Sequence, residues 1–272
     1  MLRCPNEEKT HPNRVRKELS LAGRLHPRLR DWFFGSFPAF THAQLLCVPS
    51  VLKRESILLT SPTGSGKTLA GFLGVFDSLL RELDSGGLKP GVRCIYVSPL
   101  RALAYDIEKN LRAPIVGMGL EKELRVHLRT GDTTATERTK FRNKPSPFLV
   151  TTPESLAILL AQESYAQHLA KTEFVIVDEL HSFAGNKRGA DLTISLERLE
   201  ELVGPIDLNR PRLNGWTHGS GEPPLPTRLV RIGLSATASP LDLLGEFLVG
   251  VGRQCRIAQA RIEKEQIVDV FS

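Results

Sequence analysis

The stretch ILLTSPTGSGKTLAGFL at residues 57–73 constrains the fold of this chain more than any other feature. A short strand-like run leads into a loop with two glycines, and Lys67-Thr68 then opens an apolar pattern of helical period. Gly64 and Gly66 let backbone N–H groups turn inward, and these amides form a cradle for phosphate oxygens at the positive end of the helix. The sequence therefore predicts a strand–loop–helix unit that binds a nucleoside triphosphate.

The residues of this loop have distinct expected roles. Lys67 is placed to reach the β and γ phosphates, and the hydroxyl of Thr68 is placed to coordinate Mg²⁺. Ser61 stands where such a loop usually has its first glycine, which matters little if Ser61 has an ordinary backbone conformation at the strand end. The expected nucleotide-binding residues of the loop are Ser61, Thr63, Gly64, Ser65, Gly66, Lys67 and Thr68.

The fold class follows from the alternation of short apolar runs with helical patterns. The runs are rich in Val, Ile and Leu, as expected for strands buried on both faces. The expected strands are residues 57–60, 92–98, 124–130, 148–151, 174–178 and 229–235. The expected helices are residues 67–83, 102–111, 134–141, 154–160 and 188–202. This order predicts an α/β domain of the P-loop NTPase type, with a mostly parallel central sheet and helices on both faces.

Composition suggests how the chain is divided. Residues 1–30 hold eight basic and three acidic side chains, so the remainder carries only +1 of the net charge of +6. We therefore expect residues 1–36 to be a basic N-terminal arm, helical or partly disordered, and residues 37–272 to be the domain. The Pro- and Gly-rich residues 204–228 are expected to form a surface loop. A basic arm can hold nucleic-acid phosphates, but such arms are as often only solvated, so charge alone decides nothing.

Several other classes of protein are disfavoured. No apolar run approaches the roughly 18 residues of a membrane span, and the N-terminus lacks the apolar core of a secretory signal, so a cytoplasmic location is expected. The four cysteines, which are Cys4, Cys47, Cys94 and Cys255, lie far apart without a metal-ligand spacing, and we expect reduced thiols.

Two further motifs follow apolar strands. In FVIVDELH, at residues 174–181, Asp178 is placed to hold Mg²⁺ and Glu179 to polarise an attacking water. In GLSATA, at residues 233–238, Ser235 and Thr237 could hydrogen-bond to His181 or Glu179. An acidic strand end or a helix-capping turn would explain either motif alone, so both gain their meaning from the phosphate loop.

The phosphate loop, Asp-Glu-x-His and Ser-Ala-Thr, in this order, resemble motifs I, II and III of DEAD/DEAH-type superfamily 2 helicases. The similarity is closer to the Lhr-type (large helicase-related) family, and specifically to its first RecA-like domain. The similar blocks are residues 96–115, 129–141, 149–160, 177–199 and 231–240. The resemblance runs from about Phe37 to the C-terminus, outside the expected arm and the 204–228 loop.

The resemblance implies ATP hydrolysis coupled to movement along single-stranded DNA or RNA, in the 3′-to-5′ direction. It makes ATP and Mg²⁺ the cofactors, Glu179, Lys67 and His181 the catalytic residues, and His181, Ser235 and Thr237 the coupling residues. It assigns adenine recognition to Gln44, with Phe40 or the aromatic residues 32–34 as packing, although the family usually has proline where His42 stands.

The resemblance also implies a single-strand track that contacts the backbone and has little sequence preference. The residues that match this track are Arg101, Gly131, Thr152, Glu154, Lys187 and Arg188. The family suggests DNA repair or the processing of RNA–DNA hybrids, but no residue in this chain chooses between these tasks or between DNA and RNA.

A motor of this kind needs a second RecA-like domain that supplies an arginine finger. The chain has no Gln-x-x-Gly-Arg-x-x-Arg block, so we expect the ATP-binding half of a helicase, feeble alone and completed in cis or in trans. The alternative is a non-catalytic module that binds nucleic acid or protein in response to nucleotide. A stand-alone P-loop kinase is disfavoured because Glu179 and His181 would have no role in it.

Overall fold

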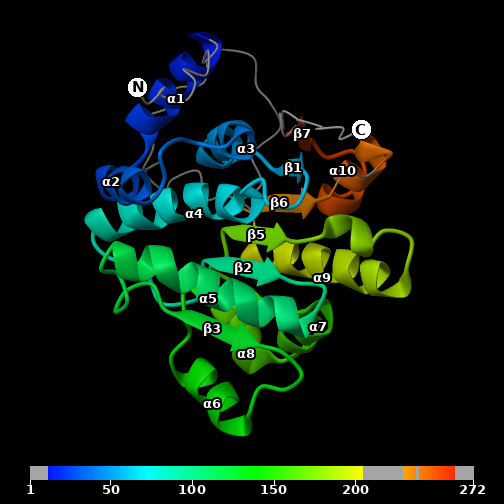
Figure 1. The fold of residues 1–272 in the computed structure, drawn as a ribbon. Coiled ribbons are helices and arrows are strands. Elements are labelled where there is room, and N and C mark those ends of the chain that lie inside the picture. Colours follow the sequence, from blue (N-terminus) through cyan, green and yellow to red (C-terminus); the bar gives the residue numbers. More distant parts are fainter. Residues whose placement is uncertain (1–11, 205–228, 237–238, 261–272) are drawn as a thin grey trace, which may run out of the picture.

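A seven-stranded sheet forms the centre of the molecule (Figure 1). The structure is a computed structural model, and it describes residues 12–204, 229–236 and 239–260. The strands are β1 (Ile57–Thr60), β2 (Cys94–Val97), β3 (Val126–Arg129), β4 (Phe148–Thr151), β5 (Phe174–Val177), β6 (Val230–Ser235) and β7 (Arg256–Gln259). Their spatial order is β3-β4-β2-β5-β6-β1-β7, and every neighbouring pair is parallel. The predicted fold class is confirmed, with a sheet that is wholly parallel in the described residues.

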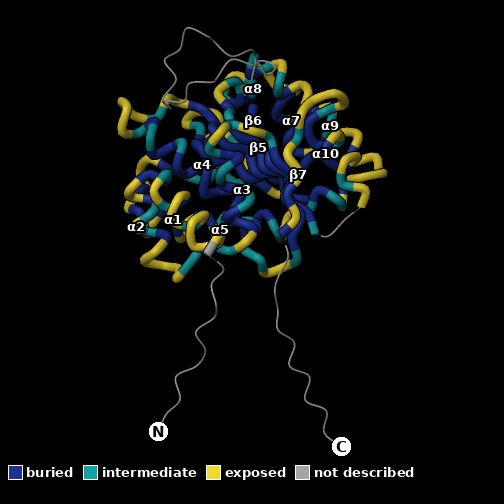
Figure 2. The backbone as a smooth tube through the Cα atoms, turned by 90° about the horizontal axis from the view of Figure 1, so that it is seen from above, coloured by how far each residue is buried: buried dark blue, intermediate teal, exposed yellow. Residues whose placement is uncertain are grey.

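Helices cover both faces of this sheet. They are α1 (Pro12–Arg24), α2 (Pro27–Ser36), α3 (His42–Leu52), α4 (Lys67–Asp84), α5 (Arg101–Gly117), α6 (Ala135–Asn143), α7 (Pro153–Ala161), α8 (Glu163–Leu169), the short 3₁₀ helix η1 (Leu180–Ser182), α9 (Lys187–Val203) and α10 (Leu241–Val249). Helices α1 to α5 contribute to one apolar core and α6 to α10 to another. The most deeply buried backbone gathers in the middle of the molecule (Figure 2).

Alternate residues of each central strand enter opposite cores, as the two-residue period of a strand requires. Ile176 of β5 lies in the core beneath α1 to α5, whereas Val175 and Val177 lie in the other core. All of these side chains are fully buried. Burial on both faces explains why the central strands read as continuous apolar runs rather than as alternating patterns.

The segment expected to be a separate arm is instead part of the domain in residues 12–36. Its helical character was anticipated, but Leu21, Leu25, Leu29 and Phe33 are buried in the same core as α3 and α4. Figure 1 shows α1 and α2 beside α3 and α4. The expectation of a separate arm rested on the basic residues of this segment. Its apolar residues, which were not considered, determine that α1 and α2 pack against α3 and α4. Residues 1–11 lie outside the described residues.

Other expectations for the elements hold to within a few residues. Each expected strand and helix is present, while the sequence did not predict α3, α8, η1, α10 and β7. β7 is an edge strand beside β1 and is largely exposed, so it lacks the apolar run that marks the central strands. The expected loop lies outside the described residues except for Gly204. No helix in the described part of the chain combines the length and apolar character needed to cross a membrane.

The carboxyl ends of the parallel strands meet at one edge of the sheet. Helices α4, α5, α7 and α9 begin there, at Lys67, Arg101, Pro153 and Lys187. The positive ends of several helix dipoles are thereby directed toward the same edge, which favours anionic ligands. In open α/β sheets, this edge is also where ligands bind.

Candidate nucleotide and nucleic-acid site

The phosphate loop runs from β1 to α4 with the backbone that its glycines allow. Gly64 has φ of 78° and Gly66 has φ of 79°, conformations that residues with a side chain rarely adopt. Gly66 is also closely approached: a Cβ there would lie 3.2 Å from Nε2 of Gln44 and 3.3 Å from Oγ1 of Thr41. Gly66 is the N-cap of α4, so Lys67 begins the helix beside the cradle of backbone amides.

Ser61 occupies the position of the missing glycine without strain. Its N–H donates to the carbonyl of Ser235 at 3.1 Å, which extends the pairing of β1 and β6 by one residue. Among the described residues with a side chain, only Arg54 and Glu179 have positive φ, so Ser61 needs no glycine. The hydroxyls of Ser61 and Ser65 are buried without a hydrogen-bond partner, as expected for a loop that can still bind a polar ligand.

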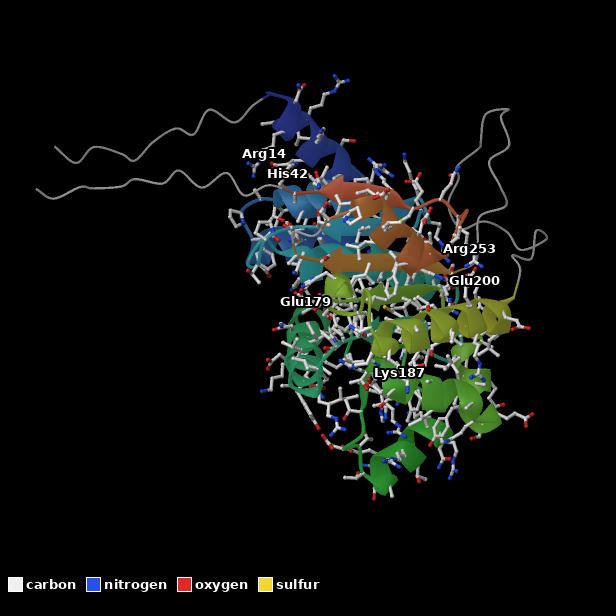
Figure 3. The ribbon with its side chains drawn as sticks, turned by 90° about the vertical axis from the view of Figure 1, so that its right-hand side faces the viewer. Arg14, His42, Glu179, Lys187, Glu200 and Arg253 are labelled. Atoms are coloured by element: carbon white, nitrogen blue, oxygen red, sulfur yellow. The ribbon has the colours of Figure 1, made fainter. Side chains whose placement is uncertain are left out.

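Lys67 and Glu179 form an ion pair at the centre of this edge. Nζ of Lys67 lies 2.8 Å from Oε1 of Glu179, and the lysine side chain is only 8% exposed. Glu179 follows β5 and has a left-handed backbone, with φ of 47° and ψ of 46°. Strained backbone of this kind persists only where the surrounding structure holds it in place, and it is found mainly at functional sites. The view onto this edge labels Glu179 together with His42 and Lys187 (Figure 3).

Asp178 is almost completely buried at the end of β5. One of its carboxylate oxygens accepts the N–H of Glu179 at 2.9 Å, and the other accepts the phenol of Tyr96. Burial raises the pKa of Asp178, and the hydrogen bond from Tyr96 acts in the opposite direction. Burial is also the main cause that raises the pKa of the Tyr96 phenol.

The oxygen donors of Asp178 and Thr68 suit Mg²⁺ better than a metal ion whose ligands all come from the protein. The described residues contain no group of three or more His, Cys, Asp or Glu able to hold a metal ion. Asp178 and Thr68 instead offer one carboxylate and one hydroxyl beside a phosphate loop. Mg²⁺ prefers oxygen donors and is usually bound through one or two protein groups, substrate phosphates and water.

His181 connects the acidic motif to β6. Its Nδ1 lies 3.0 Å from Oγ of Ser235 and 3.5 Å from Oε2 of Glu179. The hydrogen bond that the sequence led us to expect between His181 and Ser235 is therefore present, and its role in coupling stays a prediction. Thr237 lies outside the described residues.

Gln44 is buried beside the phosphate loop and does not face solvent. It forms a reciprocal capping box with Thr41: the Thr41 N–H donates to Oε1 of Gln44 at 2.9 Å, and the Gln44 N–H donates to Oγ1 of Thr41 at 3.3 Å. His42 is the first residue of α3, a position that suits proline but does not require it. The departure from the family pattern therefore leaves the start of α3 regular.

The aromatic residues suggested for adenine packing are not equally accessible. Phe40 is only 1% exposed and stacks on Phe33 with ring centroids 4.3 Å apart, so its ring is part of the core. The expectation that Phe40 packs against adenine is corrected by this burial. Phe34, at 43% exposure, keeps an accessible surface.

The residues expected to line the nucleic-acid track lie at the same edge in two ion-paired groups. Arg101 contacts Oδ1 of Asp132 at 2.7 Å, and its guanidinium lies so close to Gly131 that a Cβ there would be 2.7 Å away. Arg188 contacts Oε1 of Glu154 at 2.6 Å and donates to the carbonyl of Pro99 at 2.8 Å.

The other members of this set differ in accessibility. Lys187 is exposed, whereas Thr152 is buried at the N-cap of α7. Partial burial acts to raise the pKa of Glu154, but the hydrogen bonds that its carboxylate accepts and the charge of Arg188 together outweigh it, and the pKa is lowered. The two arginines are therefore pre-positioned cations with carboxylate partners at the edge where the helix N-termini meet.

Sequence reasoning missed Tyr96, which donates a hydrogen bond to Asp178, one of the two expected magnesium-binding residues. In the sequence it is one of four β2 residues, and its neighbours Cys94, Ile95 and Val97 are apolar. A usable signal was its phenol, because a polar group inside a strand buried on both faces needs a hydrogen-bond partner.

The comparisons with known proteins agree with this geometry. A family model described as DEAD/DEAH box helicase matches residues 41–243. The ATP-dependent helicase Lhr-Core of Methanothermobacter thermautotrophicus is 41% identical over 258 residues, which cover 91% of this chain and 27% of that protein. The Lhr helicase/uracil glycosylase of Escherichia coli is 38% identical over 236 residues, which cover 82% of this chain and 14% of that protein.

A solved structure shows the same arrangement of elements. The Mycobacterium smegmatis helicase Lhr, bound to single-stranded DNA and AMP-PNP, superposes with a TM-score of 0.72 at 36% identity. The match covers 88% of this chain and 28% of that protein. The fold is therefore RecA-like, and the chain spans about a quarter of the length of the curated Lhr-Core relatives.

Proposed function

This chain belongs to the DEAD/DEAH box helicases, and from that premise we propose that it is the ATP-binding half of an ATP-dependent nucleic-acid helicase or translocase. The observation that carries the proposal is the contact between Lys67 and Glu179 at the phosphate loop. It joins the group that would bind the γ phosphate to the group that would polarise water, and their motifs are far apart in the sequence.

The ion pair suggests how ATP binding prepares hydrolysis. The triphosphate enters the cradle of loop amides, and the ammonium of Lys67 moves from Glu179 to the β and γ phosphates. Glu179 is then free to accept a hydrogen bond from the attacking water and to take up its proton. Mg²⁺, held by Thr68 and Asp178, would neutralise charge on the β and γ phosphates.

His181 and Ser235 provide a route from the nucleotide to the rest of the domain. A shift of Glu179 after the release of Lys67 would change its contact with His181, whose Nδ1 lies 3.5 Å from Oε2 of Glu179. His181 also contacts Ser235 on the central strand β6, so the two motifs move as one hydrogen-bonded unit. We assign this unit, with Thr237, to coupling between ATP hydrolysis and movement on nucleic acid.

Single-stranded nucleic acid is the proposed track. The Mycobacterium smegmatis Lhr structure contains single-stranded DNA, which supports extending such binding to this chain. Arg101, Lys187 and Arg188 would meet backbone phosphates, so little sequence preference is expected. A second RecA-like domain, in cis or in trans, would supply the arginine finger. We also retain 3′-to-5′ movement and a cytoplasmic location as proposals.

The test compares ATP hydrolysis by this chain with that of a polypeptide in which a second RecA-like domain follows it, each with and without single-stranded DNA. Turnover and DNA stimulation are expected only in the longer polypeptide, because an arginine finger contributes about 10³ to 10⁵ in rate. Equal, DNA-stimulated turnover by the short chain would refute the half-motor assignment. Nucleotide-dependent binding without hydrolysis in either polypeptide would instead favour the non-catalytic module.

Two variants separate binding from hydrolysis in the same assay. Lys67→Ala should abolish nucleotide binding, because the phosphates lose their principal cation. Glu179→Gln should keep binding and remove hydrolysis, since the amide cannot accept a proton from water. If Lys67→Ala bound ATP as tightly as the parent chain, the phosphate-loop assignment would be wrong.

A further inference from the structure

Tyr96 is a buried polar group at the boundary between the core and the nucleotide site. It lies on β2, is 1% exposed, and pairs in register with Ile176, two residues before Asp178. Its phenol donates to Oδ2 of Asp178. The hydroxyl therefore contacts one of the two side chains proposed to hold magnesium, and the ring lies against α4, the helix that carries the other.

The two hydrogen bonds to Asp178 restrict its carboxylate. The backbone N–H of Glu179 engages Oδ1 at 2.9 Å, and the phenol of Tyr96 engages Oδ2. With one donor on each oxygen, the carboxylate plane cannot rotate without breaking a bond. Each oxygen still has a second lone pair, which can accept a bond from a metal ion or a metal-bound water.

The ring of Tyr96 also fixes the distance between two elements of the site. It stacks on Phe72 of α4, with centroids 5.3 Å apart and planes inclined by 17°. Phe72 lies one helical turn after Thr68, so the tyrosine packs against the same helix face that presents the Thr68 hydroxyl. The ring of Tyr96 thus packs against α4, while its hydroxyl donates a hydrogen bond to Asp178 at the end of β5.

A purely structural role does not account for the hydroxyl. Phenylalanine would fill the same space, keep the stacking on Phe72 and avoid burying a polar group. The position lies in a strand whose other residues are Cys94, Ile95 and Val97, so an apolar ring would suit its surroundings. Among the described residues, the hydrogen-bond partner of the phenol is the carboxylate of Asp178.

We propose that Tyr96 is a positioning residue that sets the spacing and orientation of Thr68 and Asp178 for binding of the magnesium–nucleotide complex. This inference rests on the proposed function of the site and adds a third protein group to it. Tyr96 itself touches neither nucleotide nor metal. Its effect should therefore be confined to the part of nucleotide affinity that depends on Mg²⁺.

The test is Tyr96→Phe, measured by titration of the full chain with a fluorescent ADP analogue in EDTA and in MgCl₂. Affinity in EDTA should stay within about twofold, because the loop amides and Lys67 are untouched. The gain in affinity produced by Mg²⁺ should fall about 10-fold or more, because the hydrogen bond that is lost has a charged acceptor and such bonds are stronger than neutral ones. The Mg²⁺ concentration giving half of the gain should rise accordingly.

Two controls make the result specific. Tyr165→Phe removes another buried phenol, one that donates to the carbonyl of Arg138, and it should leave the Mg²⁺-dependent gain unchanged. In an Asp178→Asn background, Tyr96→Phe should cost little further Mg²⁺-dependent affinity, because the carboxylate that it orients is gone. A full additional loss in that background would overturn the proposal.

The remaining outcomes distinguish this inference from the function on which it rests. If the parent chain gains affinity with Mg²⁺ and Tyr96→Phe gains as much, the positioning role is refuted while the ATP site stands. Equal losses in EDTA and in MgCl₂ would show that the phenol only supports the fold, which also refutes the proposal. A parent chain that binds nucleotide no better than Lys67→Ala would refute both.

Discussion

Replacing Phe33 by alanine tests whether helix α2 belongs to the nucleotide-binding domain. Phe33 is completely buried and stacks on Phe40, the residue that precedes the capping box of α3. If α2 were part of a detached arm, the substitution would change the stability of the domain very little. Because the ring lies in the core shared with α3 and α4, we expect a large loss.

The magnitude follows from what the ring contacts. Phe33 packs against Phe40 at 4.3 Å, Phe37 at 5.1 Å and Phe34 at 5.4 Å between ring centroids. Removing a fully buried phenylalanine costs about 3–5 kcal/mol through lost transfer free energy and the cavity left behind. With a urea m-value of about 3 kcal/mol per molar, the unfolding midpoint should fall by about 1 to 2 M.

The assay is urea unfolding followed by fluorescence and circular dichroism, with Phe34→Ala as the matched control. Phe34 is the next residue along α2 and keeps 43% exposure, so its loss should cost only about 1 kcal/mol. A midpoint for Phe33→Ala that equals that of Phe34→Ala, or of the parent chain, would refute the placement of α2 in the core.

Three further predictions concern other parts of the domain. Burial lowers the pKa of His127 to about 4, so its ring stays neutral when folded, and the unfolded chain binds more protons below pH 6.5. On the order of 1–2 kcal/mol of stability, discounted for partial exposure, should be lost as pH falls from 6.5 toward 4, and His127→Phe should flatten this slope in urea titrations. Gly74→Ala should lower the free energy of unfolding by about 1–3 kcal/mol in thermal or urea unfolding, because its Cβ would lie 2.5 Å from Val51. Gly71→Ala on the same helix has room for the added methyl group and should be neutral or slightly stabilising, and equal effects of the two variants would contradict the packing. Arg101→Ala should weaken single-stranded DNA binding equally for different sequences. In fluorescence anisotropy, the slope of log affinity against log salt concentration should fall by about 0.7, and an unchanged slope would exclude a phosphate contact.

Local signals in the sequence were enough for the phosphate loop and the central strands. Gly64, Gly66 and Lys67 combine a turn, a backbone cradle and a helix start within a few residues, so no distant contact is needed to recognise them. Strands buried on both faces also carry their signature in their own composition. Edge strand β7 lacks that signature, because half of its environment is solvent.

Whether α1 and α2 pack on the domain depends on their few apolar residues, and the sequence does not show that these residues outweigh the many basic ones. The basic residues of segment 12–36 are prominent in the composition, while its apolar residues are sparse and spread over two helices. Only packing against α3 and α4 shows that Leu29 and Phe33 are core residues. The same packing buries Phe40, which removes it from the surface available to adenine.

Local sequence is sufficient to identify the residues that bring phosphate-binding and acidic chemistry to this protein, because each motif is contiguous and its spacing follows from backbone geometry. Packing decided the partners of Lys67 and Tyr96, which are Glu179 and Asp178, and it placed Ser235 against His181, one of the partners that the motifs allowed. These partners come from different strands and loops, and their distances depend on strand order and register. Order and register result from burying both faces of the sheet at once, which no single segment of the sequence encodes.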